Sequence, residues 1–241
     1  MAANNTNKGL LNENFRNACR DYFYLVDREF PERGVLKLVG DRYRLDGDQR
    51  TVLYRGISSN KRSEVRKSLL TNDLEGKELV IDGYNVLFTL LNYRLGRILF
   101  ISTDNYLRDA GSLHGKLHDE NTFEECTDLM LGYLKSKKPA SAAIYLDAPV
   151  SHSGRHADLI NTKLQLNEVP GACYVIRSAD WALKQQQSAL IATSDTAIIE
   201  KAFTSVIDMP RNILERTYKA TFPELAGLIA PGECQNTVDD G

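Results

Sequence analysis

The strongest constraint on the fold of this chain is a series of short apolar runs, rich in β-branched residues, that alternate with segments of helical periodicity. Strands that alternate with helices fold into a mainly parallel sheet covered by helices on both faces. We therefore predict a three-layer α/β/α domain. Five of the runs end in an aspartate: 78–82, 98–104, 143–147, 173–180 and 189–195.

The aspartates that end these runs are expected to lie together. The carboxyl ends of parallel strands share one edge of a sheet, where open α/β sheets bind ligands. Converging carboxylates repel one another unless a cation lies between them, and Mg²⁺ and Mn²⁺ prefer such oxygen ligands. An aspartate at the end of a strand can also be only the N-cap of the next helix, an alternative that applies to Asp180 and Asp195. We expect a metal site in which some members act merely as caps.

The chain divides into two parts. Helical periodicity covers 12–30, and shorter helices are expected at 34–43, at 47–57, where Asp46 is the cap, and at 60–70. A polar segment near Glu75 separates this small all-helical unit from the first apolar run. We predict a helical domain over 12–75, an α/β domain over 76–230, and flexible ends at 1–11 and 231–241.

Composition argues against several classes of protein. Of the 241 residues, 42% are hydrophobic and 26% are charged, and no apolar run approaches the roughly 18 residues of a membrane span. The first residues lack the apolar core of a secretory signal, so we expect a cytoplasmic protein without a membrane partner. The four cysteines are scattered and form no Cys-x-x-Cys pair, which argues against a disulfide framework or a zinc ribbon.

Charge is unevenly distributed along the chain. Residues 13–67 carry 13 Lys and Arg against 9 Asp and Glu, whereas the remainder carries 17 against 23. The segment 41–55 mixes arginine with tyrosine, a composition suited to phosphate contact and base stacking, although it could equally be a solvated face. The acidic remainder could still accept a nucleic acid if its carboxylates hold cations.

The most specific local motif is Asp-Gly-Tyr-Asn at residues 82–85. An apolar strand stops at Asp82, Gly83 permits a tight turn, and Asn85 opens an apolar helix. Asp82 and Asn85 would then lie side by side, although Asn85 as an ordinary N-cap is an equally simple explanation. The motifs of other nucleotide enzymes are absent: there is no Gly-x-Gly-x-x-Gly and no P-loop, and Tyr84 stands where an aspartyl phosphotransferase has a second aspartate.

This motif resembles the first strand of the NYN branch of the PIN-like nuclease superfamily, whose members begin with a strand ending Asp-Gly-Tyr-Asn or a close variant. Three further motifs follow in the same order: Leu-Asp-Ala at Asp147, Ser-Ala-Asp at Asp180 and Thr-Ser-Asp at Asp195. The resemblance covers residues 78 to about 208. The chain differs in a short interval between Asp180 and Asp195 and in an inserted segment at 104–109. The helical front end resembles the N-terminal segment of an uncharacterised prokaryotic family, which implies no activity.

The resemblance implies a metal-dependent ribonuclease. Asp82, Asp180 and Asp195 match its acidic site, Asn85 assists them in catalysis, and Asp147 lies nearby. Carboxylates that hold Mg²⁺ or Mn²⁺ suit the hydrolysis of a phosphodiester by water, without a side-chain nucleophile.

The inserted segment adds Asp104 and Asp109 to the candidates. Asp104 is included among the expected metal ligands because it ends one of the five apolar runs. Either aspartate could extend the site or only cap and salt-bridge locally.

The segment after Asp147 is a candidate phosphate-binding loop. Its hydroxyls, Ser151 and Ser153, and its cation, Arg155, lead into a helix whose N-terminal amides attract anions. The alternative is a well-capped loop with no ligand. Arg108 is a weaker candidate for the same substrate-binding role.

Together these patterns predict a Mg²⁺- or Mn²⁺-dependent endoribonuclease, acting on RNA in preference to DNA. The leading alternative is a catalytically silent PIN-like module that binds RNA or a protein, and a second alternative is a phosphatase of small phosphoesters. The oligomeric state is left open, with a homodimer among the options.

Overall fold

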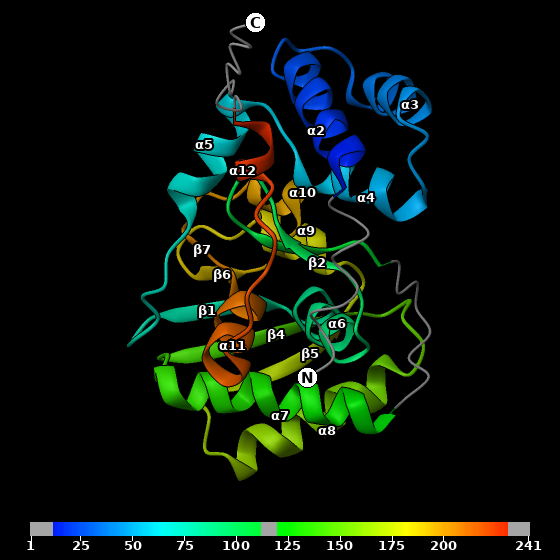
Figure 1. The fold of residues 1–241 in the computed structure, drawn as a ribbon. Coiled ribbons are helices and arrows are strands. Elements are labelled where there is room, and N and C mark those ends of the chain that lie inside the picture. The colour runs from blue at the N-terminus through cyan, green and yellow to red at the C-terminus, as the bar shows by residue number, and fades with distance from the viewer. Residues whose placement is uncertain (1–11, 112–119, 231–241) are drawn as a thin grey trace, which may run out of the picture.

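A computed structural model describes residues 12–111 and 120–230 (Figure 1). The ends predicted to be flexible, 1–11 and 231–241, lie outside the described residues. Four helices form the predicted helical unit at the front of the chain, and no described helix is long and apolar enough to cross a membrane. These helices are α2 (Glu13–Val26), α3 (Glu32–Arg42), α4 (Gly47–Gly56) and α5 (Asn60–Leu69).

Polar residues fix where the helices of this unit begin. The predicted cap Asp46 is confirmed: it forms a capping box in which its side chain accepts from the backbone N–H of Gln49 at 2.8 Å. The apolar faces of α2, α3 and α4 share a buried core that includes Phe15 and Tyr22. Phe100 and Leu225, from the α/β domain, belong to the same core, so the helical unit is packed onto that domain rather than tethered to it.

A five-stranded parallel sheet forms the centre of the α/β domain. Its strand order is β5-β4-β1-β6-β7, with every neighbouring pair parallel. The strands are β1 (Glu78–Asp82), β4 (Ser141–Asp147), β5 (Gly171–Ile176), β6 (Leu190–Ala192) and β7 (Val206–Ile207). In this order β1 lies between β4 and β6, so three of the aspartate-ended motifs meet at adjacent strands.

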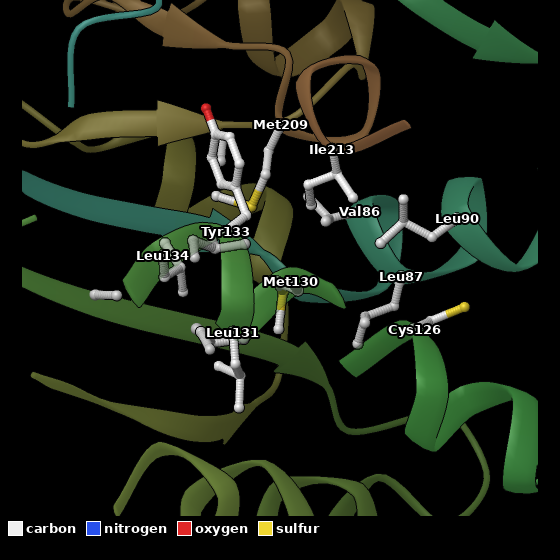
Figure 2. Close-up of a cluster of buried hydrophobic side chains, with 14 of the residues drawn as sticks. Val86, Leu87, Leu90, Cys126, Met130, Leu131, Tyr133, Leu134, Met209 and Ile213 are labelled. Carbon is white, nitrogen blue, oxygen red and sulfur yellow. The ribbon is translucent and has the colours of Figure 1, made fainter. Parts of the chain in front are cut away.

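Helices cover both faces of the sheet, as predicted. On one face α6 packs against α7 and α11, where Leu87, Leu90, Met130 and Ile213 interlock (Figure 2). Short helices α9 and α10 cover the other face and lie between the sheet and the helical unit (Figure 1). The helices are α6 (Gly83–Arg94), α7 (Glu120–Lys137), α8 (Ser153–Leu166), α9 (Ala179–Lys184), α10 (Thr196–Ile199), α11 (Met209–Tyr218) and α12 (Ala226–Ile229).

The run at 98–104 does not join the parallel sheet, so that part of the prediction was wrong. Its strand β2 (Leu99–Ile101) pairs antiparallel with β3 (Leu107–Asp109) in a separate ribbon. The ribbon lies between two cores: Phe100 packs among the helices of the front unit, while Leu99 packs in the core of the α/β domain. Because β2 is buried on both sides, its sequence is apolar throughout and resembles that of a central strand in a parallel sheet.

Candidate active site

Asp82 lies at the carboxyl end of the central strand β1 and is 5% exposed. One of its oxygens accepts from the backbone N–H of Asn85 at 3.4 Å and so caps α6, and the other accepts from the hydroxyl of Thr193 at 3.0 Å. Gly83 allows α6 to begin this close to β4, because a Cβ at that position would come within 2.6 Å of a Leu146 methyl group.

The surroundings of Asp82 disfavour its charge. Burial raises the pKa of this carboxyl from 3.8 to about 7, against the lowering effect of the hydrogen bonds from Thr193 and Asn85. The charges of Asp195 and Asp180 raise it further. Both aspartates are therefore near enough to act on the charge of Asp82.

Asn85 joins the loop after β1 to the loop after β6. Its side-chain oxygen accepts from the backbone N–H of Ser194 at 2.9 Å and from the hydroxyl of the same residue at 3.2 Å. The N-cap of α6 is Asp82, so the interpretation of Asn85 as a cap was wrong. Its amide instead holds two strand ends together.

Asp195 is the N-cap of α10 and also part of the acidic edge. One carboxylate oxygen accepts from the backbone N–H groups of Ala197 at 2.8 Å and Ile198 at 3.1 Å. Its own N–H donates to the hydroxyl of Thr193 at 3.1 Å, and Thr193 in turn donates to Asp82. Within the described parts of the chain, the second oxygen of Asp195 forms no hydrogen bond.

Asp180 and Asp147 lie at the rim of this edge. Asp180 is in the first turn of α9, where Ser178 and not Asp180 is the cap, and it pairs with Lys184 at 3.2 Å. Its side chain is 54% exposed. Asp147, at the end of β4, accepts from the backbone N–H of Ala179 at 2.8 Å and so ties β4 to the start of α9.

Asp104 occupies a different environment from the other strand-end aspartates. It is fully buried and accepts from Arg66 at 2.9 Å and from Arg108 at 2.7 and 2.9 Å. Burial opposes its ionisation, but the two arginines outweigh that effect and hold the pKa of Asp104 at about 2. Asp109 pairs with Arg55 at 3.2 Å. For both aspartates the contacts are those of local salt bridges, and they do not support Asp104 as a metal ligand.

The candidate phosphate loop lies at the expected edge of the sheet, after β4. Ser153 donates to a backbone carbonyl of the same loop at 3.3 Å, and Arg155 pairs with Glu120 at 3.1 Å. Ser151 is exposed. The N-cap of α8, His152, forms no side-chain cap hydrogen bond, so the well-capped alternative is not borne out, and the binding of phosphate stays a prediction.

Three contributors to the site escaped the sequence analysis, namely Thr193, Ser194 and Arg66, whereas Arg108 was already a candidate. Thr193 and Ser194 position Asp82 and Asn85, and their signal was present, since both precede Asp195 in its motif. Arg108 donates from Nε to the carbonyl of Ser194 at 3.2 Å, which is a supporting contact, and its predicted contact with substrate stays a prediction. Arg66 of the helical unit had no local signal, because its partners lie far along the chain.

The acidic residues at this edge of the sheet fit a hydrated Mg²⁺ or Mn²⁺ better than an ion held by protein ligands alone. In the parts of the chain that the structure covers, no three His, Cys, Asp or Glu side chains form a group that could hold a metal. Mg²⁺, however, usually keeps several waters and takes only one or two carboxylates, and these acids supply the oxygen donors that it and Mn²⁺ prefer. A cation would also offset the repulsion at Asp82. The edge therefore suits a hydrated Mg²⁺ or Mn²⁺, not a closed carboxylate cage.

Comparison with known proteins divides the chain as the structure does. Residues 14–68 match a family described as a protein of unknown function (DUF434), and residues 71–212 match one described as a domain of unknown function (DUF5616). The uncharacterised protein MJ0935 of Methanocaldococcus jannaschii is 31% identical over 201 residues, which cover 82% of this chain and 95% of that protein. No solved structure matches. The chain therefore belongs to the DUF5616 family and carries a DUF434 region in front of that domain.

Proposed function

We propose that this protein is a Mg²⁺- or Mn²⁺-dependent nuclease that hydrolyses phosphodiester bonds, in RNA in preference to DNA. The observation that carries the proposal is Asp82, a buried carboxylate at the carboxyl edge of the sheet with two further acids acting on it. Strongly perturbed acids cluster at functional sites, because a fold gains no stability from keeping them.

The order of the motifs supports the same proposal. The resemblance to the NYN branch of PIN-like nucleases rests on motifs at Asp82, Asp147, Asp180 and Asp195. The strands that carry or precede them are neighbours in the order β5-β4-β1-β6. Four short motifs spread over more than a hundred residues thus come to one edge, where open α/β sheets bind ligands.

Each side chain has a distinct part in the proposed mechanism. When bound, the ion would polarise the phosphate and promote attack by water. Asp82 and Asp195 would hold it, and the hydroxyl of Thr193 fixes the orientation of the Asp82 carboxylate. Asn85 keeps the loop that carries Asp195 beside β1 by binding Ser194. Asp180 and Asp147 add negative charge and water-binding oxygens at the rim.

The test is cleavage of labelled single-stranded RNA by the full chain with Mn²⁺. Asp82→Asn and Asp195→Asn should each lose more than about 100-fold in rate, since even changes to groups behind metal ligands cost 10–100-fold. Asp158→Asn, an exposed acid on α8, is the matched control and should cleave like the original protein. Equal rates in all four proteins would refute the mechanism.

The alternative function is a PIN-like module that binds RNA or protein without cleaving it. The lack of a three-ligand metal group among the described residues favours this alternative. It predicts RNA binding that survives Asp82→Asn and no saturable Mn²⁺ binding by calorimetry. A small-molecule phosphatase would instead turn over an aryl phosphate and leave RNA intact.

A further inference from the structure

A groove of about 830 Å³ runs along the junction of the helical unit and the α/β domain. Its walls come from the segment between α2 and α3, from α4 and α5, and from the end of α10. The helices α2 to α5 lie on the same side of the sheet as α9 and α10 (Figure 1). The groove is therefore built jointly by the DUF434 region and the DUF5616 domain.

The groove is positively charged in a protein whose net charge is −2. Five basic side chains and three glutamates line it. Arg62 pairs with Glu32 at 2.5 Å, but Arg33, Lys61 and Lys201 are exposed and form no ion pair with any described residue. Unpaired cations along a groove attract a polyanion and are the electrostatic mark of a backbone-tracking site.

Large apolar side chains are exposed between these cations. Phe30 is 52% exposed, Tyr54 is 43% exposed and Val65 is 57% exposed, and all three line the groove. Aromatic rings beside cations are the combination that binds single strands, because bases stack on the rings while the cations follow the phosphates.

A second cavity lies between the groove and the Asp195 end of the acidic edge. This smaller cavity, of about 110 Å³, shares the side chains of Tyr54 and Arg66 with the groove and reaches Ser194, Asp195 and Thr196. Arg66 is 5% exposed and already pairs with Asp104 and Glu200, so the charge offered to a ligand in the groove comes from its exposed cations.

We propose that this groove binds a single strand of nucleic acid and leads it to the Asp195 end of the acidic edge, which makes the DUF434 region the substrate-binding part of the protein. The role assigned to the acidic edge rests on the proposed nuclease function, whereas the binding itself does not. A groove of this volume has the size of a small-ligand site and accepts a few unpaired nucleotides, not a double helix.

The experiment measures binding of fluorescently labelled single-stranded RNA to the full chain by anisotropy, in EDTA and low salt, so that no cleavage is needed. The variant Lys61→Glu/Lys201→Glu reverses two charges of the groove. The matched control, Lys135→Glu/Lys219→Glu, reverses two exposed lysines at the ends of α7 and α11, outside the groove. Both variants should retain the unfolding midpoint of the original protein.

We expect the groove variant to bind about tenfold more weakly and the control to bind within about twofold of the original protein. The slope of log Kd against log salt should fall by about 1.4 in the groove variant, since each lost phosphate contact on a single strand contributes about 0.7. Phe30→Ala should weaken binding without changing that slope.

Three results of the binding assay would overturn the inference: no RNA binding by the original protein, equal losses in the two double variants, or equal affinity for a duplex of the same length. Single-stranded DNA in a parallel titration distinguishes a requirement for RNA from a requirement for any single strand. Groove-dependent binding by a protein that never cleaves would leave this inference standing and refute the nuclease function. If the groove variant cleaved RNA as fast as the original protein, the nuclease function would stand and this inference would be refuted.

Discussion

Replacing Asp82 with asparagine is expected to stabilise this protein at neutral pH. The carboxyl is 5% exposed and its pKa rises from 3.8 to about 7, chiefly through burial. A difference of about three units, at roughly 1.4 kcal/mol per unit, means that keeping this group ionised costs the folded state about 4 kcal/mol above pH 7. An amide of nearly the same shape removes that cost.

The change in stability caused by Asp82→Asn depends on pH. The folded-state pKa lies above the unfolded one, so the folded protein holds more protons between pH 4 and 7. The stability contributed by this group is therefore present at pH 4 and is lost as pH rises through about 7. The amide also weakens one hydrogen bond, with Thr193 or with the N–H of Asn85, at about 1 kcal/mol. We expect Asp82→Asn to gain about 3 kcal/mol at pH 8 and nothing at pH 4.

Urea unfolding in EDTA at the two pH values measures both proteins under the same conditions. Other groups that titrate in this range, including the buried Asp208, are common to both proteins and cancel in the difference. A variant less stable than the original at pH 8, or a difference that does not change with pH, would show that Asp82 is not an uncompensated buried charge. Retained cleavage by a stabilised variant would separate this electrostatic argument from the proposed catalysis.

Urea unfolding also tests other buried contacts, and Mn²⁺ binding tests the candidate metal site. Asp104→Asn should destabilise the protein by about 3–5 kcal/mol at pH 7, because it leaves Arg66 and Arg108 buried with less compensation, and a neutral effect would contradict the described pairing. In the original protein, the stability that Asp104 provides should persist down to about pH 4 and decline as pH falls toward 2, as urea midpoints would show. Mn²⁺ at 100 times its Kd should stabilise the original protein by about 2.7 kcal/mol and Asp82→Asn much less, so equal shifts would place the ion elsewhere. Calorimetry below pH 7 should show Mn²⁺ affinity falling by up to about tenfold per pH unit, as the ion competes with the proton; a flat profile would count against Asp82 as a ligand. Gly83→Ala should cost roughly 1–3 kcal/mol by forcing α6 away from β4, and an unchanged urea midpoint would argue against that close contact.

Local patterns were sufficient to predict most of the fold. The apolar runs that end in an aspartate predicted four of the five strands of the parallel sheet, and a cap such as Asp46 signals its helix with neighbouring residues alone. The run at 98–104 failed because its environment is not local. The backbone N–H of Ile101 bonds to Pro223 and its carbonyl accepts from Leu225, more than a hundred residues later, and no pattern within the run reveals those partners.

The candidate site shows the same division between local and distant signals. The aspartates at the ends of β1 and β6 were predictable, because strand polarity alone brings them to one edge. The link from Asn85 to Ser194 crosses 109 positions, and the pairing of Asp104 with Arg66 crosses 38. The groove requires surfaces from two sequence families and depends on how these pack together. Such contacts follow from tertiary packing, which residue spacing does not encode.

Two buried aspartates in one domain differ in how their charge is compensated, and the difference supports the proposed function. Asp104 has two arginines and a pKa of about 2, whereas Asp82 has two hydrogen-bond donors, two acidic neighbours and a pKa of about 7. The fold can therefore neutralise a buried carboxylate. It also places the guanidinium of Arg108 against Ser194, the residue that binds Asn85, but it gives Asp82 no arginine partner. Keeping Asp82 ionised costs the folded protein several kcal/mol, although an arginine lies close by at Ser194. Such a cost is expected where a cation from solution completes the site.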